Sequence, residues 1–446
     1  MHIQQVKIKN FRCFDGLTVN LNPDVNIFVG NNGSGKSAVL DAIAAAMYPY
    51  VIELQYAIDP DFATLHKPII FQRDLQKKSN NQPVAITAEF SVVTTDFPRW
   101  EVTYSRGITH NDDEGLNIFT DEYPTNPSIF TESHLNATNK LLVSLKNNPE
   151  TQLSVIAYYK ANRNLTNLTN IKILSSQSFD RFDALKNSFN AITNFTDIAK
   201  WFFLREIQEL IEGKKRKDIN FEFTDLQQIR KAISTIIAPN ARVYFSQADS
   251  AKLMVEWETK TGEKIELSIN QLSSGYRNML ALVMDFARRL AQANPQMENP
   301  LEAEAVLMID ELDLHLHPTW QQKIIPDLRK VFPNTQIIAT THSPEIVTTV
   351  ERHQVKILED YQIEECPSPT RGMKSSDIVR YVLGLDNLRP DTEESRTLTA
   401  LFEAIDNGNL EEAKRLRDKL QDWKSFDPDI TRADMQIRRL EREMTA

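Results

Sequence analysis

Hydrophobic and polar positions change their spacing several times along this chain, and each change predicts a different element. Apolar residues alternate with polar ones over 17–21, 84–92 and 100–104, which is the period of a β-strand with one buried face. The stretch Val25–Val29 is apolar except at Asn26 and ends at a glycine, as a strand buried on both faces does. The first part of the chain therefore predicts β-structure that includes one buried parallel strand.

The later part of the chain alternates between short apolar runs and segments with helical spacing. Residues 155–159, 305–309 and 336–339 are short apolar runs typical of buried strands. Apolar residues within 176–237 and 319–331 stand three and four apart, which predicts helices. Short buried strands that alternate with helices predict an α/β fold with a parallel sheet. The first helical block interrupts this rhythm, so we interpret it as an inserted arm or lid.

The end of the chain is predicted to be helical. A polar linker that contains prolines follows residue 360, and apolar stripes with helical spacing come after it. The last stripe, Ile430–Met444, repeats at three and four residues and must be buried on its own chain, on a second subunit or on a partner. The predicted domains are an N-terminal lobe 1–175, a helical arm or lid 176–240, a C-terminal lobe 241–360 and a helical partner-binding region 361–446.

The buried strand that ends at Val29 runs into a glycine-rich loop and then into an apolar helical stretch. The loop matches G-x-x-x-x-G-K-[ST], a pattern whose backbone N–H groups surround phosphates at a helix N-terminus. Lys36 would neutralise the β- and γ-phosphates, and the Ser37 hydroxyl would reach Mg²⁺. The predicted nucleotide-binding residues of this loop are Asn31, Asn32, Gly33, Ser34, Gly35, Lys36 and Ser37.

A second candidate follows the apolar run 305–309, which ends in Asp310 and Glu311. A buried strand of this kind places two acids at the edge of the sheet where the phosphate loop lies. Asp310 would hold Mg²⁺ through a water, and Glu311 would orient or deprotonate the attacking water. Acids often end buried strands, so the pairing with Lys36 is what makes the pattern specific.

A third candidate lies at the start of a predicted helix. Ser273, Ser274 and Gly275 offer hydroxyl groups, backbone donors and the positive end of a helix dipole, which suit a γ-phosphate. A plain helix N-cap explains the same residues when they are taken alone. Their place shortly before Asp310 favours the nucleotide site.

Composition narrows the class of protein. The chain has 446 residues, 41% hydrophobic and 25% charged, so it can bury a sizeable core. Its formal net charge is −10, which argues against a surface that coats nucleic acid, and the run Lys214–Lys217 is interpreted as a solvated face rather than a nucleic-acid contact. Cys13 and Cys366 give no disulfide framework, and neither a secretory signal nor an apolar run of membrane-spanning length is visible. We expect a soluble cytoplasmic protein.

These motifs, together with His342 after a predicted strand, resemble those of ATP-binding-cassette ATPases of the kind found in SMC, RecF and OLD proteins. The resemblance implies that Lys36 and Ser37 bind ATP and Mg²⁺. It also implies that Ser274 and Gly275 reach across a dimer interface to the partner's ATP, while His342 senses the γ-phosphate. The fold it implies is an ABC-ATPase head with a mixed β lobe and a parallel-sheet core.

Two further segments carry the same resemblance. Leu312–Pro318 resembles the D-loop of the family, with Asp313 in its usual place. The opening of the chain resembles the start of RecF and SMC proteins, in which the residue at the place of Arg12 approaches the nucleotide. The family's Q-loop glutamine has no clear counterpart, and Gln72 and Gln152 are the candidate substitutes.

Two related classes of protein fit the sequence less well. A transporter subunit places its signature closer to the phosphate loop than Gly275 stands to Lys36, and it works with membrane segments. OLD-type nucleases add a domain with spaced catalytic acids after the ATPase motifs. Here Asp427 and Asp429 flank a proline before a predicted helix, which indicates a turn, so we expect no intrinsic nuclease.

The helical tail, with Asn409–Ala413 and 427–433, resembles the end of the PtuA ATPases of Septu and retron antiphage systems. In those systems the ATPase pairs with a small HNH nuclease, PtuB. The resemblance implies an antiphage ATPase that forms a homodimer or higher homo-oligomer and controls such a nuclease, with a reverse transcriptase and retron nucleic acid as further partners if the system is a retron. The alternative is a RecF-like DNA-repair ATPase that binds DNA directly.

Overall fold

The computed structural model describes most of the chain, which divides into two compact units, Met1–Ile378 and Val379–Ala446. Each unit is described by itself. The residues described are 1–56, 87–97, 99–105, 127–130, 132–161, 180–191, 195–238, 240–246, 252–259, 261–385, 387–423 and 426–445. The start of the alternating run 84–92 and the first residues of the helical block 176–237 lie outside these ranges.

A six-stranded sheet forms the core of the first unit, in the order β14-β13-β3-β12-β11-β7. Its strands are β3 (Val25–Val29), β7 (Val155–Tyr159), β11 (Ala305–Ile309), β12 (Thr335–Thr340), β13 (Val355–Glu359) and β14 (Gln362–Glu365). All neighbours pair in parallel except β13 and β14. The strands β3, β7, β11 and β12 are buried at every position, which is why they appear in the sequence as continuous apolar runs. The α/β fold with a parallel core is therefore confirmed.

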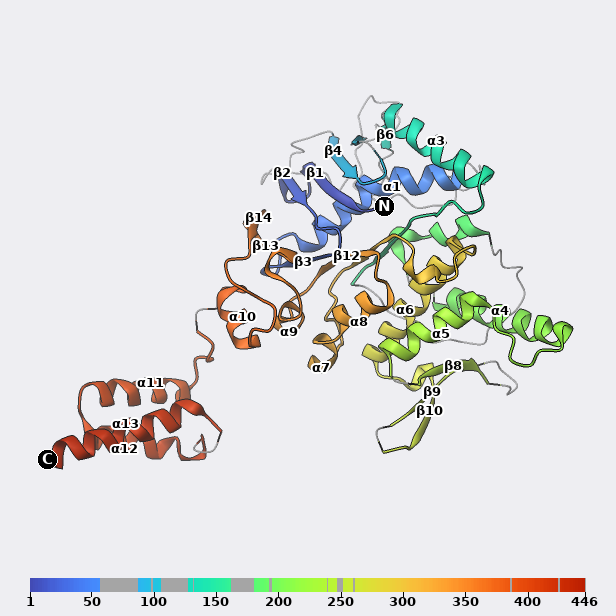
Figure 1. Cartoon of the computed structure of the whole chain (residues 1–446). Helices are drawn as coiled ribbons and strands as arrows, with labels where there is room; N and C mark the ends of the chain where they lie inside the picture. The colour runs from blue at the N-terminus through green and yellow to red at the C-terminus, as the bar shows by residue number, and fades with distance from the viewer. Residues whose placement is uncertain are drawn as a thin grey trace, which may run out of the picture. The chain divides into compact units, whose positions relative to one another are not determined.

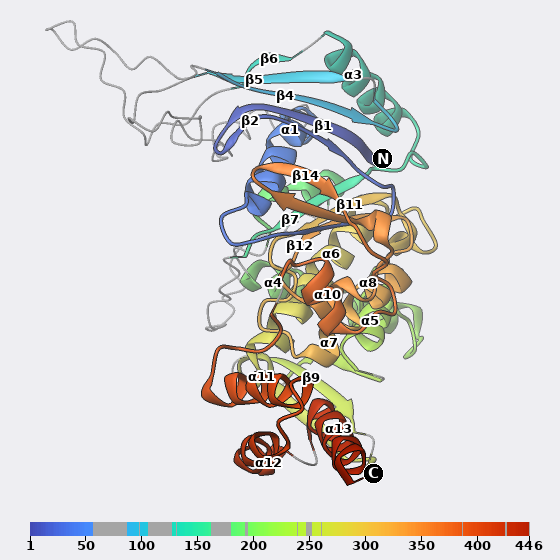
Figure 2. The same ribbon diagram turned by 90° about the vertical axis from the view of Figure 1, so that its left-hand side faces the viewer.

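A five-stranded antiparallel sheet lies on the other side of the first long helix (Figure 2). It consists of β1 (Ile3–Phe11), β2 (Phe14–Asn20), β4 (Thr87–Thr94), β5 (Trp100–Ser105) and β6 (Pro127–Phe130). The helix α1 (Lys36–Tyr56) contacts β1, β4 and β5 of this sheet and β12 of the parallel sheet. The stretch Lys36–Gln55 has the length and hydropathy of a membrane span, but most of its residues are buried inside the protein. Burial between two sheets accounts for a helix that is apolar on all sides.

Most of the remaining helices of the first unit lie beside the parallel sheet, whereas the first of them packs against α1 near the antiparallel sheet (Figure 1). They are α3 (Glu132–Asn147), α4 (Phe195–Arg216), α5 (Thr224–Ile236), α6 (Ser274–Ala293), α7 (Pro318–Gln321), α8 (Ile324–Val331), α9 (Pro344–Val347) and α10 (Ser375–Tyr381), the last of which reaches into the second unit. A small antiparallel sheet joins β8 (Arg242–Phe245), β9 (Leu253–Glu258) and β10 (Lys264–Ser268).

The helical block that the sequence predicts before residue 240 contains two long helices with different surroundings. α5 packs against α6 and α8, and its buried face includes Ile229 and Ile233. The far part of α4 exposes Leu210 and Ile211, and the turn that follows exposes Ile219. One helix thus belongs to the core, while the end of the other projects into solvent. The domain boundaries expected from the sequence remain a prediction.

The second unit is a three-helix arrangement with its own core, made of α11 (Glu393–Asp406), α12 (Leu410–Lys419) and α13 (Pro428–Thr445). Ile430, Ala433 and Ile437 of the last helix are buried against the other two. From Ile430 to Leu440, the described part of the regular stripe near the end of the chain therefore packs against neighbouring helices of its own unit. Asp427 and Asp429 pair with the Arg389 guanidinium at 2.8 and 2.7 Å.

Candidate active site

The loop after β3 takes a shape that only glycine permits at two positions. Gly30 and Gly35 have φ of 149° and 101°, which residues with a side chain rarely adopt. A Cβ on Gly30 would stand 2.3 Å from the carbonyl oxygen of Leu358, and a Cβ on Gly35 would stand 2.8 Å from the ring of Phe14. The loop therefore packs tightly on the side that faces Leu358 and Phe14, while Asn31 of the loop is exposed to solvent.

Lys36 begins α1, and its ammonium group points back into the loop. Its Nζ donates to the carbonyl oxygens of Gly30 at 3.0 Å and Asn31 at 2.8 Å. Burial lowers the pKa of Lys36, although three nearby carboxylates act in the opposite direction. The charge is thus held inside the loop, where phosphate oxygens can replace the two carbonyl groups as acceptors.

A serine, a threonine and an acid meet at the carboxyl end of the parallel sheet. The Ser37 hydroxyl donates to Asp310 Oδ1 at 3.0 Å, and the Thr340 hydroxyl donates to the same oxygen at 2.6 Å. A hydroxyl and a carboxylate are hard oxygen ligands of the kind that Mg²⁺ prefers. In the loop, the buried Ser34 Oγ has no hydrogen-bond partner, which fits a group that an acceptor on a ligand would satisfy. The donor set fits a nucleotide with Mg²⁺.

Thr340 is one site residue that the sequence analysis missed. It also accepts a hydrogen bond from the backbone N–H of Glu311 at 2.7 Å, so one hydroxyl fixes both acids that follow β11. Glu311 itself has a φ of 49°, in the left-handed region. The sequence held a partial signal, because Thr340 directly follows the predicted strand 336–339 and lies two residues before His342.

The D-loop and the segment that carries His342 are joined through one carboxylate. Asp313 Oδ1 accepts from the Thr341 hydroxyl at 2.5 Å and from the His342 backbone N–H at 3.2 Å. The His342 side chain is exposed. Asp313 thus fixes the backbone that presents the imidazole and leaves the ring itself accessible.

The signature residues pack on the D-loop of their own chain. Ser273 caps α6 by accepting from the Tyr276 N–H, and Ser274 is exposed. A Cβ on Gly275 would stand 2.3 Å from the carbonyl oxygen of His315. Within the described residues, no hydrogen bond joins Ser273, Ser274 or Gly275 to the phosphate loop. The structure therefore brings the loop and the acids together in one chain but leaves the exposed signature hydroxyl unused.

Arg12 lies beside α1 rather than in the phosphate loop. Its guanidinium pairs with Asp41 at 2.7 Å, and Lys160 pairs with the same carboxyl group at 3.2 Å. Lys160 follows β7 at the carboxyl edge of the sheet and was not singled out from the sequence. Three charged side chains, one just after β1, one in α1 and one just after β7, thus meet next to the first turns of the nucleotide-binding helix.

Of the two Q-loop candidates, only Gln152 lies within the described residues. Gln72 lies outside the described residues, as do Asn162 and Arg163 after β7. Gln152 precedes β7, so it stands at the amino end of the strand, whereas Asp310 follows the carboxyl end of the parallel neighbour.

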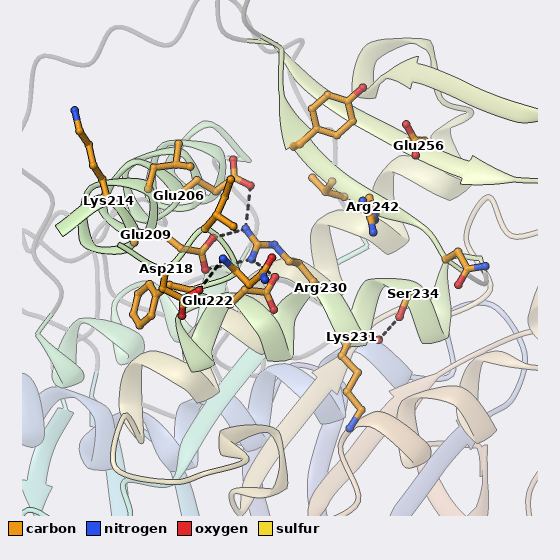
Figure 3. Close-up of a pocket in the computed structure, with 18 of the residues that line it drawn as sticks. Glu206, Glu209, Lys214, Asp218, Glu222, Arg230, Lys231, Ser234, Arg242 and Glu256 are labelled. Carbon is orange, nitrogen blue, oxygen red and sulfur yellow. Dashed lines mark hydrogen bonds and ion pairs between the residues drawn. The ribbon is translucent and has the colours of Figure 1, made fainter. Parts of the chain in front are cut away.

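A cavity of about 1290 Å³ lies elsewhere in the first unit, along α4, α5 and β8 (Figure 3). Inside it, Arg230 pairs with Glu206, Glu209 and Glu222 at 2.7 to 3.4 Å. Burial raises the pKa of Glu206 to about 7. Neither the phosphate loop nor the acids after β11 line this cavity, so the predicted nucleotide site is a separate, open edge of the sheet.

Comparisons with known proteins agree with this geometry. The family model described as "AAA ATPase domain" matches residues 1–347. Retron Ec83 probable ATPase of Escherichia coli is 27% identical over 89% of this chain and 79% of that protein. Retron Vc95 probable ATPase of Vibrio cholerae serotype O1 biovar El Tor is 26% identical over 94% of this chain and 86% of that protein. Septu protein PtuA of Bacillus thuringiensis is 25% identical over 87% and 85%.

Among solved structures, the SMC head domain from Thermotoga maritima matches with a TM-score of 0.42 and 15% identity, over 82% of this chain and all of that one. The resemblance to PtuA-type ATPases of Septu and retron systems expected from the sequence is confirmed. The family model covers well over half of the chain, including the phosphate loop, Asp310 and His342. This chain belongs to the family of AAA ATPase domains.

Proposed function

We propose that this chain binds ATP with Mg²⁺ and hydrolyses it at a site that two copies complete head to tail. The observation that carries the proposal is the meeting of Lys36, Ser37 and Asp310 at one edge of the sheet. The second support is that Ser274 is exposed at the start of a helix and is not hydrogen-bonded to the loop of its own chain. A helix N-terminus with free donors suits a phosphate supplied from outside the chain.

Each side chain has a role that follows from its position. Lys36 exchanges its carbonyl acceptors for phosphate oxygens and orients them. Ser37 and Asp310 are the residues that would hold Mg²⁺, which when bound neutralises charge on the phosphates. Glu311, whose backbone Thr340 fixes, orients the attacking water and accepts its proton.

The second copy supplies the remaining contacts. Ser274 and Gly275 at the start of its α6 donate to the γ-phosphate, where negative charge is concentrated. His342, exposed at the end of β12, contacts the same phosphate from the first copy. Asp313 keeps this segment and the D-loop in register. Neither copy alone offers donors on both sides of the γ-phosphate.

We further propose that the nucleotide state controls a partner HNH nuclease in an antiphage defence system of the cytoplasm. The support comes from relatives that are a Septu PtuA protein and retron ATPases and that match most of this chain. The helical region 361–446 is the part proposed to bind that nuclease, and the ATPase carries no nuclease site of its own. In a retron, a reverse transcriptase and its nucleic acid product complete the assembly.

The Glu311→Gln variant tests the proposed hydrolysis. We expect it to bind ATP as the wild type does, to accumulate as an ATP-bound dimer and to lose about 100-fold or more in turnover, since a general base is removed. Glu359→Gln is the matched control, because Glu359 is an exposed acid at the end of β13, a strand of the same sheet that is not adjacent to β11. Wild-type turnover by Glu311→Gln would contradict the role assigned to this residue.

A separate experiment tests the partner. Co-expression with the small HNH nuclease encoded beside the gene is expected to yield a complex whose plasmid cleavage changes with ATP. If the purified chain alone binds duplex DNA and no such complex forms, the RecF-like alternative is favoured. If the purified chain cuts plasmid with Mg²⁺ or Mn²⁺, the expected absence of nuclease activity is wrong.

A further inference from the structure

The helix that carries the signature residues is tied to the parallel sheet by buried polar side chains. Tyr159 ends β7, and its hydroxyl donates to Asp285 Oδ2 on α6 at 3.0 Å. Arg289, one turn further along α6, donates from Nε to the same oxygen at 2.8 Å. The three residues are each at most 3% exposed.

A second buried anchor joins the residues just before the same strand to the C-terminus of the same helix. The Leu153 N–H donates to Asn294 Oδ1 at 2.8 Å, and Asn294 Nδ2 donates to the Leu153 carbonyl oxygen at 3.0 Å. Asn294 is fully buried and directly follows α6. Because two separated anchors define a direction, Tyr159 and Leu153 together fix the axis of α6 relative to β7.

Charge is retained inside this contact. Although burial opposes ionisation, the guanidinium groups of Arg289 and Arg288 lower the pKa of Asp285 to about 2. Arg289 Nη1 is also satisfied by the carbonyl oxygens of Ala184 and Lys186 at 2.7 and 2.8 Å. Well-packed apolar residues often stabilise a core as much as a buried ion pair does. What such a cluster adds is a directional contact, which fixes the orientation of α6 relative to β7.

Tyr159 also contacts the other half of the ATPase site. Its carbonyl oxygen accepts from the Asp310 N–H at 2.9 Å. Asp285 lies three turns along α6, about 16 Å from the start of the helix at Ser274. One residue thus joins the Asp310 end of the sheet to the helix that begins with the signature.

We propose that the Tyr159–Asp285–Arg289 cluster is a positioning device that sets the angle at which α6 presents its first turn to the nucleotide held by a second copy. This inference rests on the head-to-tail dimer proposed above. None of the three side chains is placed at the nucleotide, so each acts through α6. A small rotation about the Leu153 anchor would move the start of α6 more than any other part of the helix.

Tyr159→Phe removes the hydroxyl and keeps the ring. Tyr50→Phe is the matched control, because the equally buried Tyr50 hydroxyl donates at the same 3.0 Å distance to the Ser154 carbonyl oxygen. In the Glu311→Gln background we expect Tyr159→Phe to weaken ATP-dependent dimerisation about tenfold, with the ATP affinity of the single chain unchanged. Tyr50→Phe should change neither. Equal dimerisation by the two variants, measured by sedimentation and by nucleotide titration, overturns the proposal.

Mixed dimers, made from two differently tagged copies, show in which copy the cluster acts. In these dimers one copy carries Glu311→Gln and the other keeps Glu311. The one remaining active site is then formed by the Glu311 of the unchanged copy and by the signature residues of the Glu311→Gln copy. Tyr159→Phe is expected to lower kcat about tenfold when it is added to the Glu311→Gln copy and to have no effect when it is added to the other. A loss only in the other copy would mean that Tyr159 acts through Asp310, and equal losses would mean general destabilisation. Either result overturns the proposal.

Ser274→Arg in the same mixed dimers separates this inference from the proposed function. If Ser274→Arg lowers turnover only when it is placed in the copy with the intact Glu311, each chain uses its own signature residues. The proposed head-to-tail dimer is then wrong. If Ser274→Arg acts only from the Glu311→Gln copy and Tyr159→Phe changes neither turnover nor dimerisation, the dimer stands and the positioning role is wrong.

Discussion

Gly275 marks the closest contact between the signature and the D-loop of one chain, and adding a single carbon there has a calculable effect. In Gly275→Ala the new Cβ would stand 2.3 Å from the His315 carbonyl oxygen, whereas ordinary contact begins at 3.4 Å. The obstructing atom belongs to the backbone, so no side-chain rotation relieves the overlap. The two segments must separate by about 1 Å, because repulsion rises steeply below contact distance.

A displacement of that size is large for a catalytic group. A misplacement of about 1 Å in a positioning contact can cost about 100-fold in rate, so we expect Gly275→Ala to lower kcat by about that factor. The affinity of the chain for ATP should stay within about twofold of the wild type, since the signature makes no hydrogen bond to the phosphate loop of its own chain.

Steady-state turnover and titration with a fluorescent ATP analogue measure the two quantities. Gly16→Ala is the matched control, because a Cβ on Gly16 meets nothing within 4 Å. If Gly275→Ala hydrolyses ATP at the rate of Gly16→Ala, the contact with His315 does not position the signature and the reasoning is refuted. A loss of ATP affinity equal to the loss of kcat would also refute it.

Two further predictions concern stability. Ile430→Ala leaves a cavity at a fully buried position of the second unit and should lower the free energy of unfolding by about 2–5 kcal/mol, enough to expose 379–446 to limited proteolysis while ATP binding is retained. Met435→Ala is the control, because Met435 is exposed on the same helix. Equal proteolysis of the two variants would count against a separate core. The pKa of Asp285 is lower in the folded protein than in the unfolded chain. Its ionisation therefore stabilises the fold by about 2 kcal/mol at any pH above the unfolded pKa, and this stabilisation is lost as the pH falls from about 4 toward 2. Urea unfolding should therefore show the stability gap between wild type and Asp285→Asn narrowing below pH 4; a gap that is constant down to pH 2.5 would contradict the assignment.

Patterns that repeat within a few residues were sufficient to predict the elements and the phosphate loop. The buried strands β3, β7, β11 and β12 are visible as apolar runs because both of their faces are covered. The glycine loop was predictable because its conformation depends on its own residues, with left-handed φ at Gly35 and a lysine that folds back on Gly30. Asp310 beside Ser37 followed from the rule that parallel strands end at one edge.

Most other side-chain contacts between distant segments required the tertiary structure, because a sequence pattern does not say which side chains of neighbouring elements meet. Thr340 reaches Asp310, and Arg12 turns to Asp41, only after the strands and α1 have packed. From the sequence, the apolar stripe that begins at Ile430 could be buried on its own chain, on a second subunit or on a partner. The structure shows that Ile430 and the apolar residues after it pack within their own unit. Local chemistry thus determined what each segment could become, whereas the packing of segments far apart in the chain decided which side chains share a hydrogen bond.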